Sequence, residues 1–468
     1  MYRNSFLLTA LLILLTASSS VPAQSGRGRQ SAPPPPPRQQ REQPAALNVP
    51  EGGKIVKQEV SGSTVRYTLK NGLTVIVRER YAVPLAAVVT YVKAGYFDEA
   101  DEVAGLAHLM EHMFFKGTPT RPVGTIATET RKLGGVLNAS TYYDKTSYYT
   151  IAPAESLSKV LEIQADLLQN PTFDANELKK EALVVIQESK RKQDNPMALA
   201  LERMYATAFT ANRIKRWRIG ADDVLKNSTR EQLQAFYQNY YRPNNTVIVV
   251  VGAVPSRQVI GQIQQLYGNF QSTEIKRTPG PEEPAQDKLR YSNERGDITQ
   301  TVVTVGYHAP ALNSTAEGLK EQATLEVLSA VLGLGRGARL NQVLREKSGI
   351  VSDVSANYQP LPGVGVFSVQ MRLDPGRIDS AEGEYFREIE KFRRELLSES
   401  ELQRAKSMLE KRFYDEVNSV DDEAEALARY QSQLGDFKLL DSYIARIRAV
   451  TAKDIQQAAA KYLTFNNA

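Results

Sequence analysis

The chain has 468 residues, of which 42% are hydrophobic, a formal net charge of +5 and no cysteine. This length exceeds one compact core, so we expect two domains of ordinary size, and the lack of thiols excludes stabilisation by disulfides. Part of the basic excess lies in a tail, at Arg27, Arg29, Arg38 and Arg41, and not in a stripe interleaved with aromatic residues, which argues against nucleic-acid binding.

The first 23 residues have the layout of a secretory signal peptide. Arg3 precedes an apolar run from Phe6 to Leu15, and small residues end at Ala23, so we expect cleavage near Ala23/Gln24 and a periplasmic or secreted protein. The alternative is an uncleaved leader that tethers the protein to the inner membrane, although this run is shorter than the ~20 residues that span a bilayer. No later segment is apolar for long enough to cross a membrane.

Residues 24–52 have the composition of a linker rich in proline, arginine and glutamine. Five consecutive prolines at residues 33–37 favour an extended polyproline form, and the stretch lacks the apolar residues that a core requires. The alternative is a segment that docks on a proline-reading partner domain.

Strand patterns open the first domain, which we expect to cover residues 53–277. The segments 65–69 and 73–77 flank an Asn71-Gly72 turn and predict a hairpin, and a further strand is expected at 86–92.

The hydrophobic period then changes from two residues to about 3.6 over residues 103–115, which predicts a helix. Further helices are expected at 123–133, 155–168, 174–192 and 229–240, and a closing strand is expected at 246–251.

A second break, rich in proline and glycine, predicts a linker at residues 278–286 and a second domain at 287–468. A strand at 302–308 followed by an apolar helix at 325–334 repeats the order of the first half, but the second half ends without a final strand. We therefore expect an α+β fold with two tandem homologous α/β domains, each a mixed, mostly antiparallel sheet with helices packed on one face.

Two of the three histidines, His108 and His112, stand four residues apart on the helix predicted at 103–115. Residues at this spacing share one helix face, so both imidazoles can reach a single ion at the ~2.0–2.1 Å that zinc requires. Glu111 borders the same face, where a carboxylate can hold and deprotonate a water that a metal activates. The alternative is a pair of histidines beside a helix acid with no metal between them, but chance matches to this motif are rare.

The third ligand is best sought in the helix predicted at 174–192. Glu188 is the preferred candidate because Glu181 lies two turns before it on the same face, although Glu177 continues that line. Acids on a helix are more often solvated than functional, so spacing alone leaves this ligand open. His308 has no partner at ligand spacing and is expected to be structural.

The sequence His108-Leu-Met-Glu111-His112, followed after 75 residues by Glu188 with Glu181 seven before it, resembles the pitrilysin-like peptidases with an inverted zinc motif. That family includes the mitochondrial processing peptidase. The resemblance implies one Zn²⁺ per chain with ligands His108, His112 and Glu188, Glu111 as the base, and Glu181 as an acid that orients a ligand histidine. Supporting segments lie at residues 93–95, 114–118, 134–141 and 240–245.

The resemblance also implies that Asn138 and Ala139 lie on an edge strand that pairs with an extended peptide, with Phe115 and Arg345 as further substrate-binding residues. Without the resemblance, Asn138 is better interpreted as a turn residue. In self-sufficient members an arginine and, seven residues later, a tyrosine grip the substrate near the metal. Here Arg345 fills the first position and Ser352 the second, and a serine is too short to replace a phenol.

We therefore expect a zinc endopeptidase for short or unfolded peptides, acting as the catalytic subunit of a heterodimer in which a related, non-catalytic subunit supplies an intact arginine–tyrosine pair. The intact ligand set favours this function over a non-catalytic peptide-binding member of the family or a scaffold tethered by its proline-rich tail. One loop departs from relatives that often have His-Pro-Tyr before the residue equivalent to Gly220, because this chain has Asn212-Arg213-Ile214 there. The sequence leaves the role of that loop open.

Overall fold

The computed structural model describes residues 49–468. The predicted signal peptide and nearly all of the predicted proline-rich linker lie outside the described residues. Within the described part of the chain, no helix is both long and apolar enough to cross a membrane. The sequence assigns residues 49–52 to the linker, but Glu51 and Gly52 already belong to a short 3-10 helix, η1 (Glu51–Gly53). Gln264 Nε2 donates a hydrogen bond to Gly53 O at 2.9 Å.

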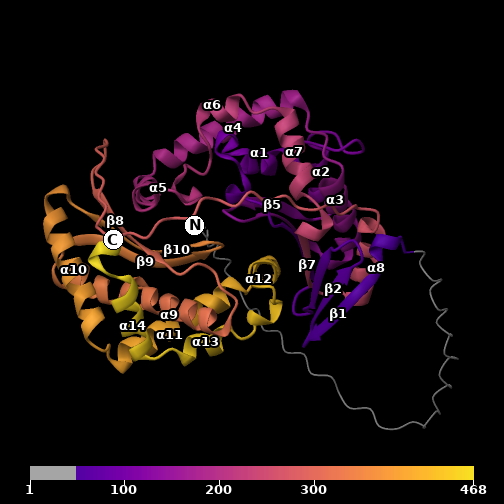
Figure 1. Cartoon of the computed structure of the whole chain (residues 1–468). Coiled ribbons are helices and arrows are strands. Elements are labelled where there is room, and N and C mark those ends of the chain that lie inside the picture. The colour runs from indigo at the N-terminus through magenta and orange to yellow at the C-terminus, as the bar shows by residue number, and fades with distance from the viewer. Residues whose placement is uncertain (1–48) are drawn as a thin grey trace, which may run out of the picture. The chain divides into compact units, whose positions relative to one another are not determined.

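The first sheet has seven strands in the order β1-β2-β3-β7-β4-β6-β5 (Figure 1). Neighbouring strands are antiparallel except β3 and β7, which run parallel, so the expected mixed, mostly antiparallel sheet is confirmed. The strands are β1 (Ile55–Ser61), β2 (Thr64–Leu69), β3 (Thr74–Glu79), β4 (Leu85–Val92), β5 (Val136–Thr141), β6 (Thr146–Pro153) and β7 (Thr246–Gly252).

The predicted hairpin is formed by β2 and β3, in which Val65 lies opposite Val77. Gly72 in its turn has φ +84°, a left-handed conformation that glycine adopts without the strain a Cβ would bring. A Cβ there would also lie 2.8 Å from the Asn244 side chain, so the turn requires glycine for space as well.

Most helices of the first half lie over one face of this sheet, and a core of aliphatic and aromatic side chains lies between them and the strands. The predicted helix at 103–115 is shorter than expected, because Gly105 takes a left-handed conformation with φ +102° and the α-helix begins only after it. The helices are α1 (Leu106–Phe114), α2 (Thr125–Lys132), α3 (Leu157–Gln169), α4 (Ala175–Gln193), α5 (Pro196–Ala208), α6 (Asp222–Lys226), α7 (Arg230–Tyr240) and α8 (Ser256–Tyr267).

The second sheet has three antiparallel strands, β8 (Thr301–Ala309), β9 (Val351–Leu361) and β10 (Val364–Leu373), in the order β8-β10-β9. This order matches β4-β6-β5 of the first sheet, so the two halves share a spatial pattern as well as an order of elements. After the last helix the chain forms the 3-10 turn η10 (Phe465–Asn467) and no strand.

The one helix that the sequence predicted in the second half is longer than its apolar run indicated. The helix expected at 325–334 begins at Ala316, because Thr315 caps it by accepting a hydrogen bond from Gly318 N at 3.1 Å. The helices of the second half are α9 (Ala316–Gly333), α10 (Ile378–Arg394), α11 (Glu399–Glu416), α12 (Val420–Leu434), α13 (Tyr443–Ala449) and α14 (Ala452–Tyr462).

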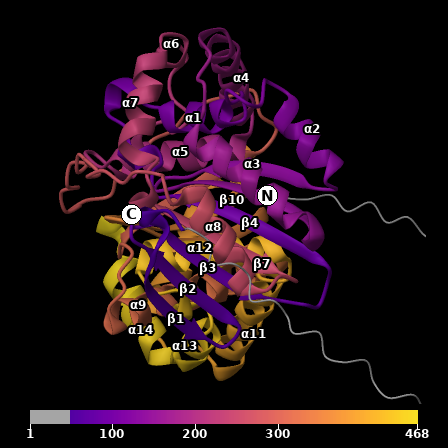
Figure 2. The same ribbon diagram turned by 90° about the vertical axis from the view of Figure 1, so that its right-hand side faces the viewer.

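One of these helices, α12, packs on the face of the first sheet that the helices of the first half leave open (Figure 2). Ala424 and Leu427 of α12 are fully buried in one cluster with Tyr91 of β4 and Val249 of β7. The first sheet is therefore covered on both faces. The second sheet also receives a helix from the other half, since α5 packs on β8. The expectation of helices on one face thus describes only the helices that each half places on its own sheet.

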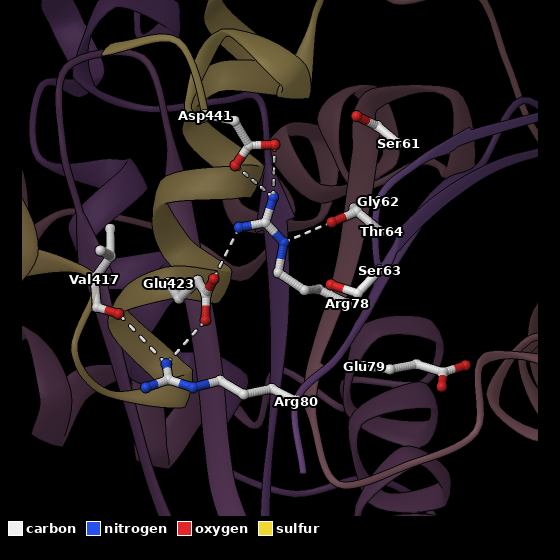
Figure 3. A pocket seen from close by; sticks show the side chains of 10 residues that line it. All are labelled: Ser61, Gly62, Ser63, Thr64, Arg78, Glu79, Arg80, Val417, Glu423 and Asp441. Carbon is white, nitrogen blue, oxygen red and sulfur yellow. Dashed lines mark hydrogen bonds and ion pairs between the residues drawn. The ribbon is translucent and has the colours of Figure 1, made fainter. Parts of the chain in front are cut away.

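A cavity of about 480 Å³ lies beside the contact between α12 and β3 (Figure 3). Glu423 Oε1 binds Arg78 Nη1 at 2.8 Å, and Glu423 Oε2 binds Arg80 Nη1 at 2.9 Å. Asp441 adds a second carboxylate, with Oδ1 2.9 Å from Arg78 Nη2. Both arginines are thus matched by acids, so we interpret these groups as an ionic clasp between α12 and β3 and not as a reaction site.

Candidate metal centre

The N-terminus of α1 is fixed by a buried carboxylate. Glu99 accepts hydrogen bonds from the backbone N–H groups of Gly105 at 3.0 Å and Ala107 at 2.5 Å, which satisfies two donors that a helix start leaves free. Burial raises the pKa of Glu99 to about 8, although these hydrogen bonds act in the opposite direction. The apolar residues Leu109 and Met110 are fully buried in the first core, which turns His108, Glu111 and His112 toward α4.

Three predicted residues converge between α1 and α4. One ligand atom from each of His108, His112 and Glu188 lies within 4.8 Å of the other two. Glu188 Oε2 is 3.5 Å from His108 Nε2 and 3.6 Å from His112 Nε2. Ligands about 2.0–2.1 Å from a tetrahedral zinc ion lie roughly 3.3–3.4 Å from one another, so this spacing fits one zinc ion.

The imidazole of His108 is neutral. Burial lowers its pKa to about 3, and the charges of His112, Arg218 and Lys192 act in the same direction. A neutral ring keeps a lone pair on Nε2, the atom that faces Glu188, and metal coordination needs that lone pair. His108 Nδ1 is buried without a hydrogen-bond partner in the described structure.

His112 is oriented by Glu181. Glu181 Oε2 lies 2.9 Å from His112 Nδ1, and Glu181 Oε1 lies 2.6 Å from Lys116 Nζ. Burial favours the protonated acid, but the hydrogen bonds to Lys116 and His112 outweigh it and hold the pKa of Glu181 below its ordinary value. A carboxylate at this position holds the proton on Nδ1 and leaves Nε2 free to bind a metal.

Glu111 lies beside this cluster and is held by a residue that the sequence did not single out for a role. Thr141, the last residue of β5, donates a hydrogen bond from Oγ1 to Glu111 Oε2 at 2.6 Å. Burial raises the pKa of Glu111, and the bond from Thr141 offsets this only in part. Glu111 is therefore a stronger proton acceptor than an exposed glutamate.

Glu177, the other acid whose position on the predicted helix made it a possible third ligand, lies outside the cluster. Glu177 pairs with Lys180 on the surface of α4 at 2.7 Å. His308 stacks on Phe209 with ring centroids 4.4 Å apart and places Nε2 2.8 Å from Ala208 O, a structural role as the sequence predicted.

Asn138 and Ala139 lie on β5, the edge strand of the first sheet, opposite Tyr149 and Tyr148 of β6. Asn138 Oδ1 accepts a hydrogen bond from the Ala139 N–H at 2.9 Å. Phe115, directly after α1, packs edge-on against Tyr148 with ring centroids 5.9 Å apart. β5 therefore offers its free edge next to Glu111.

The remaining predicted residue, Arg345, lies in the second half, on the helical turn η7 (Asn341–Lys347). Its guanidinium forms no hydrogen bond or ion pair with the described residues, and it does not belong to the cluster of ligands. Ser352, at the position of the missing tyrosine, is exposed, and its Oγ donates to Arg372 O on β10 at 3.1 Å.

Comparison with known proteins gives matches over most of the described chain. Residues 74–222, which contain the whole cluster, match the family model described as Insulinase (Peptidase family M16). Residues 227–409 match the model described as Peptidase M16 inactive domain.

Individual relatives match over similar lengths. An uncharacterized zinc protease of Rickettsia felis is 29% identical over 394 residues, which cover 84% of this chain and 93% of the relative. A probable mitochondrial-processing peptidase subunit beta of Arabidopsis thaliana is 26% identical over 414 residues, which cover 85% of this chain and 75% of the relative. The crystal structure of a protease from Helicobacter pylori has a TM-score of 0.81 at 26% identity and covers 90% of this chain and 98% of that one. The chain therefore belongs to peptidase family M16, the pitrilysin-like peptidases.

Proposed function

We propose that this chain is a zinc-dependent endopeptidase that hydrolyses short or unfolded peptides. His108, His112 and Glu188 would hold one Zn²⁺, and the observation that supports this most directly is the convergence of their three ligand atoms within 4.8 Å. The ion would act as a Lewis acid on the substrate carbonyl and lower the pKa of a bound water. Three protein ligands leave the fourth position open, as in catalytic zinc sites.

Glu111 is the general base in this proposal. Its carboxylate would take the proton of the attacking water and pass it to the nitrogen of the leaving amine. The burial that raises its pKa makes it a better acceptor, and the Thr141 hydroxyl holds one of its oxygens so that the other can face the water. Glu181 would keep His112 in the tautomer that binds metal.

The substrate would bind as an additional strand on β5. Asn138 and Ala139 lie on the free edge of this strand, where main-chain hydrogen bonds accept many sequences but require an extended peptide. Asn138 would release the N–H of Ala139 when a peptide arrives, since its own side chain occupies that donor in the free protein. Phe115 would line the same region from the end of α1.

The assembly in this proposal is a heterodimer with a related, non-catalytic subunit. Ser352 cannot reach a substrate as a tyrosine does, and its hydroxyl already binds the backbone of β10. Arg345 fills its own position but lacks that companion. One relative is named as a beta subunit, which fits a chain that works with a partner. The layout of the leader supports a periplasmic or secreted location.

The test combines metal analysis with peptide turnover. We expect about one zinc per purified chain, and we expect His108→Ala to lose it because two ligands cannot hold the ion. Glu111→Gln should keep the zinc and lose about 10²–10⁴-fold in kcat, the usual contribution of a general base.

Glu177→Gln is the matched control, since it removes a carboxylate from the same helix as Glu188 but outside the cluster, and it should change neither readout. A chain that binds no zinc, or Glu111→Gln with full turnover, contradicts the proposed function. Activity should be low for the chain alone and rise when the partner is added.

A further inference from the structure

The loop after α5, residues 209–220, contacts both helices that bear the proposed ligands. The last residues of this loop, Ile219 and Gly220, pack closely against Ala104 and Gly105 at the start of α1. A Cβ on Gly105 would lie 2.3 Å from Ile219 O, and a Cβ on Gly220 would lie 2.2 Å from Ala104 O, so both positions require glycine. The loop therefore has one fixed position relative to α1.

The same loop holds the last turns of α4. Trp217 Nε1 donates a hydrogen bond to Ser189 Oγ at 2.8 Å, and Ser189 is 1% exposed. Lys192 Nζ lies 4.7 Å from the centre of the Trp217 ring and forms an ion pair with Glu202 of α5. Glu202 also binds Arg218 Nε at 3.3 Å. Three contacts thus fix this end of α4 to the loop and α5.

These contacts fix the part of α4 that carries Glu188. Glu188 directly precedes Ser189, lies five residues before α4 ends at Gln193, and its side chain is 34% exposed. Within residues 49–468, the only ion pair or hydrogen bond of the Glu188 side chain outside the cluster is a 3.7 Å approach to Arg191, which is itself 73% exposed. A ligand carboxylate must be held within about 0.5 Å of its working position, and these neighbours do not hold it.

We propose that Trp217 is a positioning residue for the metal centre, acting through the hydroxyl of Ser189 to fix the rotation of α4 that presents Glu188 to His108 and His112. This inference rests on the proposed zinc function. It gives a role to the loop in which this chain departs from the His-Pro-Tyr pattern of its relatives. Because Trp217 is the single tryptophan of the chain, its fluorescence also reports on this region.

A purely structural role for Trp217 is the competing explanation, since its half-buried ring also packs against the first core. Trp217→Phe separates the two explanations, because it keeps an aromatic ring next to Lys192 but removes the N–H donor. Ser189→Ala removes the acceptor of the same hydrogen bond from the opposite side.

The experiment measures the zinc dissociation constant of the full-length chain by competition with a chelator of known affinity. We expect Trp217→Phe and Ser189→Ala each to raise it about 10-fold, at the low end of the range for residues that orient a metal ligand. The double variant should bind zinc no more weakly than the single variant with the lower affinity, since the two substitutions remove the same hydrogen bond. The melting temperatures of the metal-free proteins should agree within about 2 °C, and tryptophan emission of the wild type should change on addition of zinc.

Ser158→Ala is the control, because Ser158 on α3 accepts a hydrogen bond from Gln262 on α8, a bond that involves neither ligand helix. It should leave the zinc affinity unchanged. If the wild type binds zinc and His108→Ala abolishes this, but Trp217→Phe binds as tightly as the wild type, the positioning role is wrong while the proposed function stands. Additive losses in the double variant, or losses that follow the melting temperature of the metal-free protein, also overturn it. A wild type without zinc affinity overturns both.

Discussion

Thr141 illustrates how much of this site depends on single side chains outside the zinc motif. Its hydroxyl fixes one oxygen of Glu111, as Glu181, itself paired with Lys116, fixes His112. None of these contacts follows from helix or strand periodicity, since Thr141 lies 30 residues after Glu111 in the sequence. Without such a partner the Glu111 carboxylate, the proposed general base, would sample several rotamers, and only some of them would face a substrate.

At this scale we predict that Thr141→Val lowers kcat of the active enzyme about 10-fold with little change in KM. Valine keeps the shape of the side chain and removes the hydrogen bond, which to a charged group contributes about 1.5–3 kcal/mol. Steady-state kinetics with a fluorogenic peptide measures both parameters. Thr128→Val is the control, since the hydroxyl of Thr128 binds Gly124 O on exposed α2. Equal kinetics for wild type and Thr141→Val would exclude an orienting role for the hydroxyl.

At the scale of elements, the extended segment between α8 and β8 is held by side chains and lacks regular structure. Glu283 accepts hydrogen bonds from the backbone N–H groups of Thr210, Ala211 and Asn212 at 2.7–2.8 Å. Burial alone would raise the pKa of Glu283, but these three donors lower it to about 2. The segment is thereby attached to the same loop that carries Trp217.

The pKa of Glu283 predicts an acid-sensitive contribution to stability. A carboxyl whose pKa is lower in the folded than in the unfolded chain stabilises fully above about pH 4.5 and loses this contribution as the pH falls toward 2. Glu283→Gln should therefore cost about 2 kcal/mol in the free energy of unfolding at pH 7, and the difference from wild type should shrink at pH 3. Urea titrations at both pH values measure it. The exposed Glu294, paired with Arg203, is the control, and a difference for Glu283→Gln that is independent of pH would contradict the prediction.

Elements with a local signature could be predicted from the sequence. Examples are the Asn71-Gly72 hairpin, the helix of His108 and the helix of Glu188. They depend on turn-forming residues and on hydrophobic periodicity, both of which are visible within a short stretch of sequence. The predicted first residues of helices were less accurate where a single capping residue determines the start of the helix, as Gly105 does for α1 and Thr315 for α9. Contacts such as Thr141 with Glu111, or Trp217 with Ser189, depend on how whole elements pack, and no local pattern records that.

At the scale of the whole molecule, the main feature is the crossing of α12 onto the first sheet. Its amphipathic pattern predicts a buried face but does not say which sheet buries it. The ionic clasp is centred on Glu423, whose side chain is 12% exposed and binds both Arg78 and Arg80 (Figure 3). Asp441, at 49% exposure, is the outer member.

The exposure of these two acids predicts different effects on stability. Glu423→Gln should lower the free energy of unfolding by about 2–3 kcal/mol, because it leaves two partly buried arginines without their shared carboxylate. Asp441→Asn should cost less than about 1 kcal/mol, as expected for a solvated pair. Urea unfolding at neutral pH and moderate salt compares the two variants. A larger loss for Asp441→Asn than for Glu423→Gln would contradict the assignment of Glu423 as the central acid.

The burial of Tyr91, Val249 and Leu427 in one cluster has a consequence for how such a chain can be divided. A gene fragment that ends before the second half would expose an apolar surface on the face of the first sheet that α12 covers. Such a fragment would aggregate even though it retains all three proposed zinc ligands. Evolution could separate the two halves into different polypeptides only by giving that surface a new cover. The ancestry of a two-part chain of this kind is therefore constrained by one helix that contributes none of the proposed zinc ligands.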